Sequence, residues 1–139
     1  MEKNSNSDDD IIFMKEALKE AKKAYKKKEV PVGVVLVKEG KIVSRGHNNK
    51  ENKNNPLGHA EIIAINKYCK KNNTWRLNDI TMYVTLEPCL MCTGTLISSR
   101  IKNVYYGVKD KKLGSIEVNY NKKLTCKGKI FKDDKVIYK

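Results

Sequence analysis

Apolar residues recur at helical spacing near the start of the chain. Those that share one face of the predicted helix are Ile11, Phe13, Met14, Ala17, Leu18, Ala21, Ala24 and Tyr25. This spacing predicts an amphipathic helix over residues 8–28. Ser7 fits its N-cap, and the acidic residues 8–10 suit the positive end of a helix. Residues 1–7 are polar, and we expect them to be disordered.

Short runs of β-branched residues follow this helix and predict strands. The runs "VPVGVVLV" and "IVSRGHN", joined by the turn "KEGK", predict a β-hairpin within residues 30–48. Further along, the apolar pattern alternates between helical and extended spacing. It predicts a helix at 59–71, a strand at 80–87, a helix at 89–100, a strand at 104–108 and a last strand near 123–131.

This order of elements predicts a single α/β domain over residues 8–139, because no linker or internal repeat divides the chain. We expect a three-layer α/β/α sandwich with a mixed five-stranded sheet. The strand–helix–strand stretch over residues 80–108 should form a parallel crossover. A chain of 139 residues is long enough to bury a core without disulfide bonds.

The net charge of +13 favours a polyanionic partner, but composition offers a second explanation. Lysine occurs 26 times against three arginines, and asparagine occurs 14 times, so the surplus is also consistent with a bias of the whole proteome. From Arg100 to Lys139, twelve basic residues stand against four acidic ones. The run "KKAYKKK" is either the solvated face of the first helix or a phosphate contact.

The chain shows no sign of membrane insertion or secretion. No apolar run reaches the length of a membrane span, and the N-terminus lacks the apolar segment of a signal peptide. Its four cysteines are too few and too unevenly spaced for a secreted disulfide scaffold. We therefore expect a cytoplasmic protein, with a nuclear or organellar location left open.

Two of the predicted helices begin with residues that bind metals. "GHAEIIAI" brings His59 and Glu61, and "LEPCLMC" brings Cys89 and Cys92 three positions apart. A helix N-terminus lowers the pKa of a cysteine and favours the thiolate. One imidazole and two thiolates favour zinc, and three protein ligands plus water are typical of catalytic rather than structural zinc. Glu61 is then the candidate for moving the proton of that water.

Each of these motifs also has an ordinary structural interpretation. His59 alone fits a core histidine, and the cysteine pair alone fits a thioredoxin-like pair or two buried apolar residues. Their joint occurrence, with a strand before the Pro-Cys, favours the metal site. Cys69 and Cys126 lie in a predicted helix and a predicted strand, and we interpret them as structural.

"HAE" followed by "PCLMC" resembles the H-x-E…P-C-x-x-C signature of zinc-dependent base deaminases. Over roughly residues 13–114 the chain resembles the tRNA-specific adenosine deaminases. The likeness is carried in order by "VPVGVVLV", "GHN", "NPLGHAEIIAI", "MYVTLEPCLMCTG", "SRI" and "VYYGVKDKKLG". The resemblance implies a cytidine-deaminase-like fold and the hydrolytic conversion of adenosine to inosine at the wobble position of tRNA.

The resemblance also implies roles for individual residues. His59, Cys89 and Cys92 would hold one Zn²⁺ per chain, and Glu61 would be the catalytic proton carrier. Substrate-binding roles would fall to Asn48 as the base-holding side chain, Ala60 and Pro88 through their backbone groups, and Asp110 and Lys112 in a D-x-K loop.

The implied partners are the anticodon loop of tRNA and a second subunit, in a homodimer or in a heterodimer with a related chain. After Gly114 the family usually continues to a C-terminal helix, which we expect to be curtailed here. The chain would then be a fragment, or Lys122, Lys123, Lys127 and Lys129 would compensate, or a partner would supply the grip on RNA. Two alternative functions stay open: deamination of a free base or nucleotide of guanine or cytosine type, and a zinc-bearing non-catalytic subunit of an RNA-editing dimer.

Overall fold

The computed structural model describes residues 8–116 and the backbone of residues 125–129. Within them, helix α1 spans Asp8–Lys26, α2 spans Ala60–Asn72 and α3 spans Leu90–Ser98. The strands are β1 (Gly33–Lys38), β2 (Lys41–His47), β3 (Thr81–Leu86), β4 (Asn103–Val108) and β5 (Thr125–Lys129). The predictions of a Ser7 cap, of disorder in residues 1–7 and of a curtailed C-terminal helix concern residues outside the described ones.

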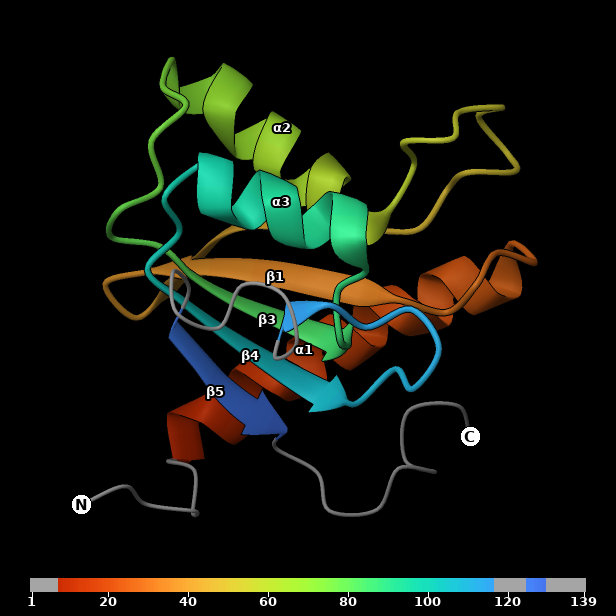
Figure 1. The fold of residues 1–139 in the computed structure, drawn as a ribbon, viewed down its shortest axis with the longest axis horizontal. Coiled ribbons are helices and arrows are strands. Elements are labelled where there is room, and N and C mark those ends of the chain that lie inside the picture. The colour runs from red at the N-terminus through yellow and green to blue at the C-terminus, as the bar shows by residue number, and fades with distance from the viewer. Residues whose placement is uncertain (1–7, 117–124, 130–139) are drawn as a thin grey trace.

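The strands form one mixed sheet in the order β2-β1-β3-β4-β5. β1 pairs antiparallel with both β2 and β3, whereas β3 and β4 are parallel, as the predicted crossover through α3 requires. Helix α1 covers one face of this sheet, and α2 and α3 cover the other (Figure 1). The α/β fold with helices on both faces is therefore confirmed.

Apolar side chains fill the space on each side of the sheet. The larger core lies between the sheet and helices α2 and α3, and includes Leu36, Met82 and Tyr106. The smaller one lies under α1 and includes Met14 and Tyr83. No helix of the described part is long and apolar enough to cross a membrane.

Two glycines permit the helices to approach the strands closely. A Cβ at Gly33 would lie 2.0 Å from the carbonyl oxygen of Ala17 in α1. A Cβ at Gly46 would lie 2.6 Å from the carbonyl oxygen of Ala60, at the start of α2. The second contact positions α2 against the end of β2, which is where the candidate site begins.

Helix α1 ends at Lys26 rather than at residue 28, because the chain reverses at a left-handed residue. Lys28 has φ 64°, and the Glu29 N–H donates to the carbonyl of Ala24 at 2.9 Å. This is the pattern of a Schellman C-terminus. Strand β1 begins at Gly33, beyond Pro31, which has no N–H to donate to a ladder.

Candidate metal centre

The two predicted motifs meet at the N-terminal ends of α2 and α3. His59 is the N-cap of α2 and Cys89 is the N-cap of α3, and both have extended backbone conformations. Their carbonyl groups accept the first helical hydrogen bonds, from Ile63 at 3.1 Å and from Thr93 at 2.8 Å. Neither side chain caps its helix. Both side chains are therefore left to face each other across the gap between the helices.

The distances among the three candidate ligands fit a tetrahedral zinc ion. The Sγ atom of Cys89 lies 3.7 Å from Nδ1 of His59, and the Sγ atom of Cys92 lies 3.6 Å from the same nitrogen. All three ligand atoms lie within 4.8 Å of one another. A tetrahedral ion with Zn–N of about 2.0 Å and Zn–S of about 2.3 Å separates its nitrogen and sulfur ligands by about 3.5 Å. The donor set and its spacing thus suit zinc bound through Nδ1 of His59.

The two thiols are electrostatically coupled. A hydrogen bond from the Cys92 thiol lowers the pKa of Cys89 to about 5, although burial opposes this change. Nearby His59 and the backbone N–H groups of Met91 and Cys92 also favour the Cys89 thiolate. The same bond to Cys89, together with burial, raises the pKa of Cys92. One thiolate is therefore already favoured, and a divalent cation between the sulfurs would favour the second.

Glu61 lies in the first turn of α2, two residues after His59, and its side chain is buried. Burial raises the pKa of Glu61 to about 7, and the charge of Cys89 adds to this rise. Hydrogen bonds from its own backbone and from Cys92 act in the opposite direction. A carboxyl group with a pKa close to neutral can both accept and donate a proton at that pH.

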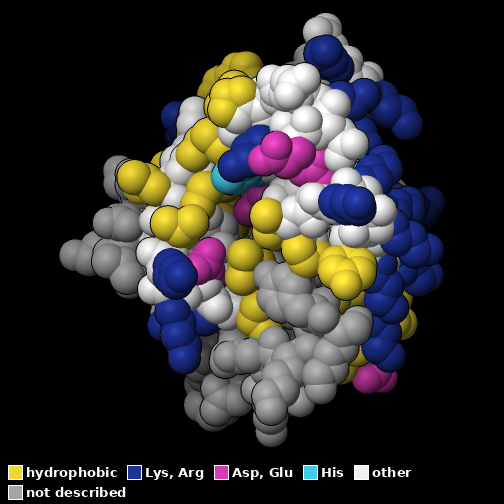
Figure 2. All heavy atoms as spheres, turned by 90° about the vertical axis from the view of Figure 1, so that its right-hand side faces the viewer, with side chains coloured by type: hydrophobic (Ala, Val, Ile, Leu, Met, Phe, Trp, Pro, Cys, Tyr) yellow, Lys and Arg dark blue, Asp and Glu magenta, His cyan; other side chains and the backbone are white. Residues whose placement is uncertain are grey.

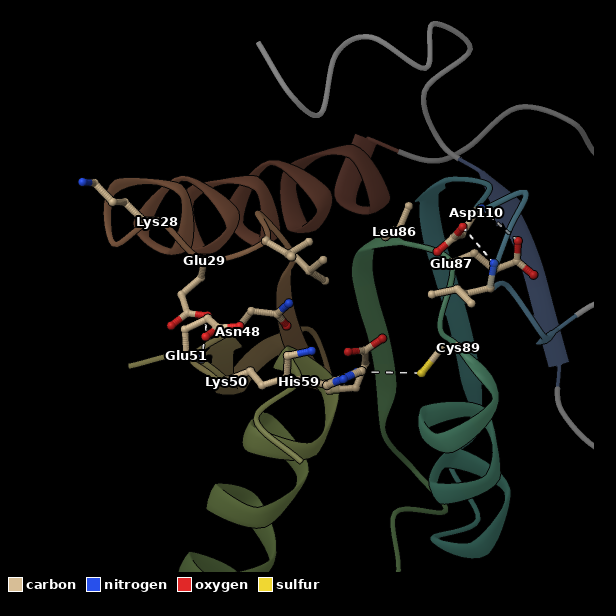
Figure 3. A pocket seen from close by; sticks show the side chains of 14 residues that line it. Lys28, Glu29, Asn48, Lys50, Glu51, His59, Leu86, Glu87, Cys89 and Asp110 are labelled. Carbon is tan, nitrogen blue, oxygen red and sulfur yellow. Dashed lines mark hydrogen bonds between the residues drawn. The ribbon is translucent and has the colours of Figure 1, made fainter. Parts of the chain in front are cut away.

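A cavity of about 340 Å³ opens beside these residues. Its volume falls in the range of about 300–1,000 Å³ that is usual for small-molecule pockets. The lining comes from the first turn of α2, the end of β3 and the segments that precede or flank the starts of α2 and α3: Lys28, Glu29, Val30, Val32, Asn48, Lys50, Glu51, His59, Glu61, Leu86, Glu87, Cys89, Asp110 and Leu113. Figure 3 shows the His59 and Cys89 side chains, which both line the cavity, facing each other.

Asn48 links this cavity to the N-terminus of α2. It follows β2, and its Oδ1 accepts a hydrogen bond of 2.8 Å from the backbone N–H of Ala60. The Asn48 N–H in turn donates to the carbonyl of Val32 at 3.2 Å. Because Oδ1 is occupied, the side-chain NH₂ group is the part of Asn48 that can donate to a bound molecule.

The other predicted substrate-binding residues are placed differently. Asp110 lines the cavity, but its Oδ1 accepts the N–H groups of Lys112 and Leu113 and so stabilises a turn. Ala60, Pro88 and Lys112 are not among the lining residues. The Ala60 N–H is held by Asn48, and the Pro88 carbonyl accepts from Ser115 at 3.0 Å. Their roles toward a substrate stay predictions.

Two buried glutamates of the lining were not singled out from the sequence. Glu87 is 3% exposed, and its Oε1 accepts the N–H of Asp110 at 3.2 Å. Glu29 is 5% exposed and accepts the backbone N–H groups of Glu51 and Asn52 at 3.1 and 2.7 Å. An acidic residue directly after an apolar strand, as in "TLEPC", is the signal that points to Glu87. Glu29 is part of a lysine-rich run, and its contacts depend on a loop that is distant in sequence.

Cys69 packs against the larger core, in agreement with a structural role, and the side chain of Cys126 lies outside the described residues. Among the described residues, His59, Cys89 and Cys92 are the only cluster of three potential metal ligands.

Comparison with known proteins identifies the family. The sequence profile described as "Cytidine and deoxycytidylate deaminase zinc-binding region" matches residues 7–108, which include every residue of the metal cluster. The chain belongs to this family of zinc-binding deaminases. The predicted membership is therefore confirmed, and with it the expectation of a zinc-binding deaminase domain.

Individual relatives show which kinds of deaminase the chain resembles. The chain is 50% identical over 105 residues to the tRNA-specific adenosine deaminase of Bacillus subtilis, covering 76% of this chain and 65% of the relative. It matches the solved structure of a tRNA:A34 deaminase with a TM-score of 0.83 and 35% identity, covering 86% of this chain and 93% of the other. The guanine deaminase of Bacillus subtilis gives a TM-score of 0.68 and 37% identity, covering 70% and 63%. The chain spans about two thirds of the length of the first curated relatives it matches, 66% and 65%.

Proposed function

We propose that this deaminase-family chain converts adenosine to inosine at the wobble position of tRNA by zinc-dependent hydrolysis. The observation that carries the proposal is the arrangement of His59 Nδ1 and two cysteine sulfurs at 3.6–3.7 Å, with the buried carboxyl group of Glu61 two residues from the histidine. The likeness to tRNA adenosine deaminases, at 50% identity over 105 residues, supports adenosine in tRNA as the substrate.

In this proposal His59, Cys89 and Cys92 hold one zinc ion per chain. Bound zinc supplies Lewis-acid activation of water at neutral pH. The remaining chemistry belongs to the residues of the chain.

Glu61 carries the protons of the reaction. It takes one proton from the attacking water and delivers it to the ring nitrogen N1, which makes C6 electrophilic. As the oxygen bonds to C6 and the C6–N bond breaks, Glu61 delivers the second proton to the departing amino group, which leaves as ammonia. The burial that places the pKa of Glu61 near 7 suits both steps.

The rest of the cavity orients the base. The side-chain NH₂ of Asn48 would donate to a nitrogen of the purine, while its Oδ1 stays bound to Ala60. Apolar contact would come from Val32, Leu86 and Leu113 of the lining. A cavity of about 340 Å³ suits a single nucleoside rather than a stack of bases. The adenosine must therefore leave the stack of the anticodon loop before it can enter.

A tRNA substrate further implies a cytoplasmic location, and the family resemblance implies a homodimer or a heterodimer with a related chain. A monomer mass in light scattering at micromolar concentration would contradict the dimer.

The proposal is tested by incubating the zinc-loaded chain with an anticodon stem-loop that carries A34 and digesting the product to nucleosides. Mass spectrometry should show inosine together with an equimolar loss of adenosine. A stem-loop with C34 in place of A34 is the matched control and should stay unchanged. Failure to form inosine from the A34 stem-loop would contradict the proposal.

A second candidate is deamination of a free purine base, favoured by the 37% identity and the TM-score of 0.68 to guanine deaminase. A panel of guanine, free adenosine and cytosine nucleotides separates the two functions. Conversion of guanine to xanthine without conversion of the stem-loop would establish the second candidate in place of the first.

A further inference from the structure

Lys50 is an exposed lysine that lines the deaminase cavity rather than the outer surface alone. In Figure 3 its side chain runs inward from the loop after β2, toward His59. On the face of the molecule seen in Figure 2, basic and acidic side chains surround a hollow together with a histidine. The family resemblance assigns no role to this lysine.

The backbone around Lys50 is held firmly. Its carbonyl accepts the N–H of Asn55 at 3.0 Å, and the N–H of Asn49 donates to the carbonyl of Gly58 at 3.0 Å. A Cβ at Gly58 would lie 2.9 Å from the Cα of Lys50, so the two ends of the loop are in close contact.

Glu29 fixes the next two residues of the same loop. Its carboxylate accepts the backbone N–H groups of Glu51 and Asn52 and a side-chain N–H of Asn52. The loop that carries Lys50 is therefore anchored on both sides, and less entropy is lost when this lysine binds a ligand than on a free loop.

Lys50 is a basic residue in a cavity whose other charged side chains are mostly acidic. Five carboxyl groups line the same cavity: Glu29, Glu51, Glu61, Glu87 and Asp110. Such a lining repels a polyanionic substrate unless a cation lies at the mouth. No ion pair of Lys50 occurs within the described part of the chain, so its ammonium group is available to an anion. Lys28 also lines the cavity, but Figure 3 shows its side chain pointing away.

We propose that Lys50 binds a phosphodiester group next to the adenosine that enters the cavity, and so selects a nucleotide within RNA over a free nucleoside or base. This inference rests on the proposed function. A phosphate one bond from the ribose is the nearest anion that such a substrate offers to a cation at the mouth. Glu61 and Asn48 act on the base, whereas Lys50 binds the RNA backbone next to that base.

A double-mutant cycle between protein and RNA tests the contact. The RNAs are the A34 stem-loop and two copies in which a neutral methylphosphonate replaces the phosphate on the 5′ or the 3′ side of A34. The proteins are the zinc-loaded chain, Lys50→Ala and Lys50→Arg. Both kcat/KM for inosine formation and Kd by fluorescence anisotropy are measured.

Lys50→Ala should weaken binding of the native stem-loop by about tenfold, as expected for a charge-assisted hydrogen bond at a partly exposed site. One of the two methylphosphonate RNAs should bind the unchanged protein about tenfold more weakly than the native stem-loop does. Lys50→Ala should not weaken the binding of that RNA any further. Lys50→Arg should keep most of the affinity. The slope of log K against log salt should become shallower by about 0.7 for the lost contact with single-stranded RNA.

Lys53→Ala is the matched control, because Lys53 is an exposed lysine of the same loop that does not line the cavity. Two results would contradict the contact between Lys50 and the phosphate: equal losses of affinity for Lys50→Ala and Lys53→Ala, or a further loss of affinity when Lys50→Ala is combined with each of the two methylphosphonates. Normal inosine formation in these experiments would still support the proposed function. Absence of inosine with every protein would instead overturn the proposed function and the contact together.

Discussion

The cavity has a metal side and a rim, and they are held in different ways. On the metal side, His59 and Cys89 are N-caps, so two helix starts fix their backbones directly. On the rim, Lys50 and Glu51 lie in an exposed loop that is fixed through a buried carboxylate, Glu29, from another part of the chain. The proposed metal ligands thus depend on local helix geometry, while the residues proposed to contact the substrate depend on long-range hydrogen bonds.

Because the two sides are held differently, a substitution on one side should leave the function of the other side unchanged. Changes on the metal side should remove zinc or turnover, whereas changes on the rim should weaken substrate handling and leave zinc bound. Three substitutions test this separation, and a fourth tests a hydrogen bond that supports the rim; the expected losses decrease in that order.

Cys92→Ala should cause the largest loss, because it removes a buried cysteine that we propose as a zinc ligand. We expect zinc content to fall by more than about tenfold, activity to become undetectable and the thermal midpoint to drop. Metal analysis and a thermal scan measure these changes. Cys69→Ala is the control, since Cys69 packs against the core away from the cluster. Full zinc content in Cys92→Ala would contradict the ligand assignment.

Glu61→Gln should separate chemistry from metal binding within the same side. The amide cannot carry a proton, so inosine formation should fall by about 10²–10⁴-fold, while zinc content stays that of the unchanged chain. Single-turnover rates with the A34 stem-loop give the first number and metal analysis the second. Glu39→Gln, in the hairpin turn, should behave as the unchanged chain. Retained turnover in Glu61→Gln would rule out its role as proton carrier.

Asn48→Ala should have a smaller effect, since it removes the proposed contact with the base and one observed hydrogen bond at the junction of the two sides. We expect kcat/KM to fall by roughly tenfold to a hundredfold, with zinc retained, because a buried N–H of Ala60 also loses its acceptor. Asn66→Ala, on the exposed face of α2, is the control. Loss of zinc in Asn48→Ala would show that the two sides are not independent.

The smallest effect concerns the outer support of the rim, where Glu20 of α1 accepts a hydrogen bond from His47, next to Asn48. Burial tends to raise the pKa of Glu20, but the hydrogen bonds from His47 and Lys23 outweigh it, and the net pKa is lowered. A lowered native pKa gives stability that is present above the unfolded pKa and lost as pH falls through the native value. Glu20→Gln should therefore lower the thermal midpoint by a few degrees at pH 6.

The difference in thermal midpoint between the unchanged chain and Glu20→Gln should disappear as the pH falls below about 4, the ordinary pKa range of a glutamate. Thermal scans between pH 3 and pH 6 measure it. Arg45 forms ion pairs with both Glu20 and Glu16, and Glu16 is the more exposed of the two, so Glu16→Gln provides the comparison and should have a smaller effect. A gap that widens toward low pH would contradict the sign of this pKa shift.

The sequence was enough to predict that His59, Cys89 and Cys92 lie together, but it did not predict the rim, and the reason is physical. The ligands and Glu61 lie within two short motifs, and a helix start places residues three positions apart in a predictable way. The rim required the position of the loop at residues 49–58, which depends on Glu29 more than twenty residues earlier in the chain. No local pattern in "KKKEVP" shows that this carboxylate is buried.

The same reason explains the errors at element boundaries. The prediction carried the first helix to residue 28, but a left-handed residue at Lys28 ends it at Lys26. Lysine has no sequence preference that announces this conformation. By contrast, the parallel pairing of β3 and β4 followed from the strand–helix–strand order alone.

We propose that three protein ligands hold a catalytic zinc ion, and X-ray absorption at the zinc edge of the loaded full chain measures those ligands. With His59, Cys89 and Cys92 as ligands, the spectrum should show two sulfur atoms at about 2.3 Å and two lighter nitrogen or oxygen atoms at about 2.0 Å. Three or four sulfur atoms per zinc, with Cys69 or Cys126 recruited as a further ligand, would contradict this proposal and make the site structural.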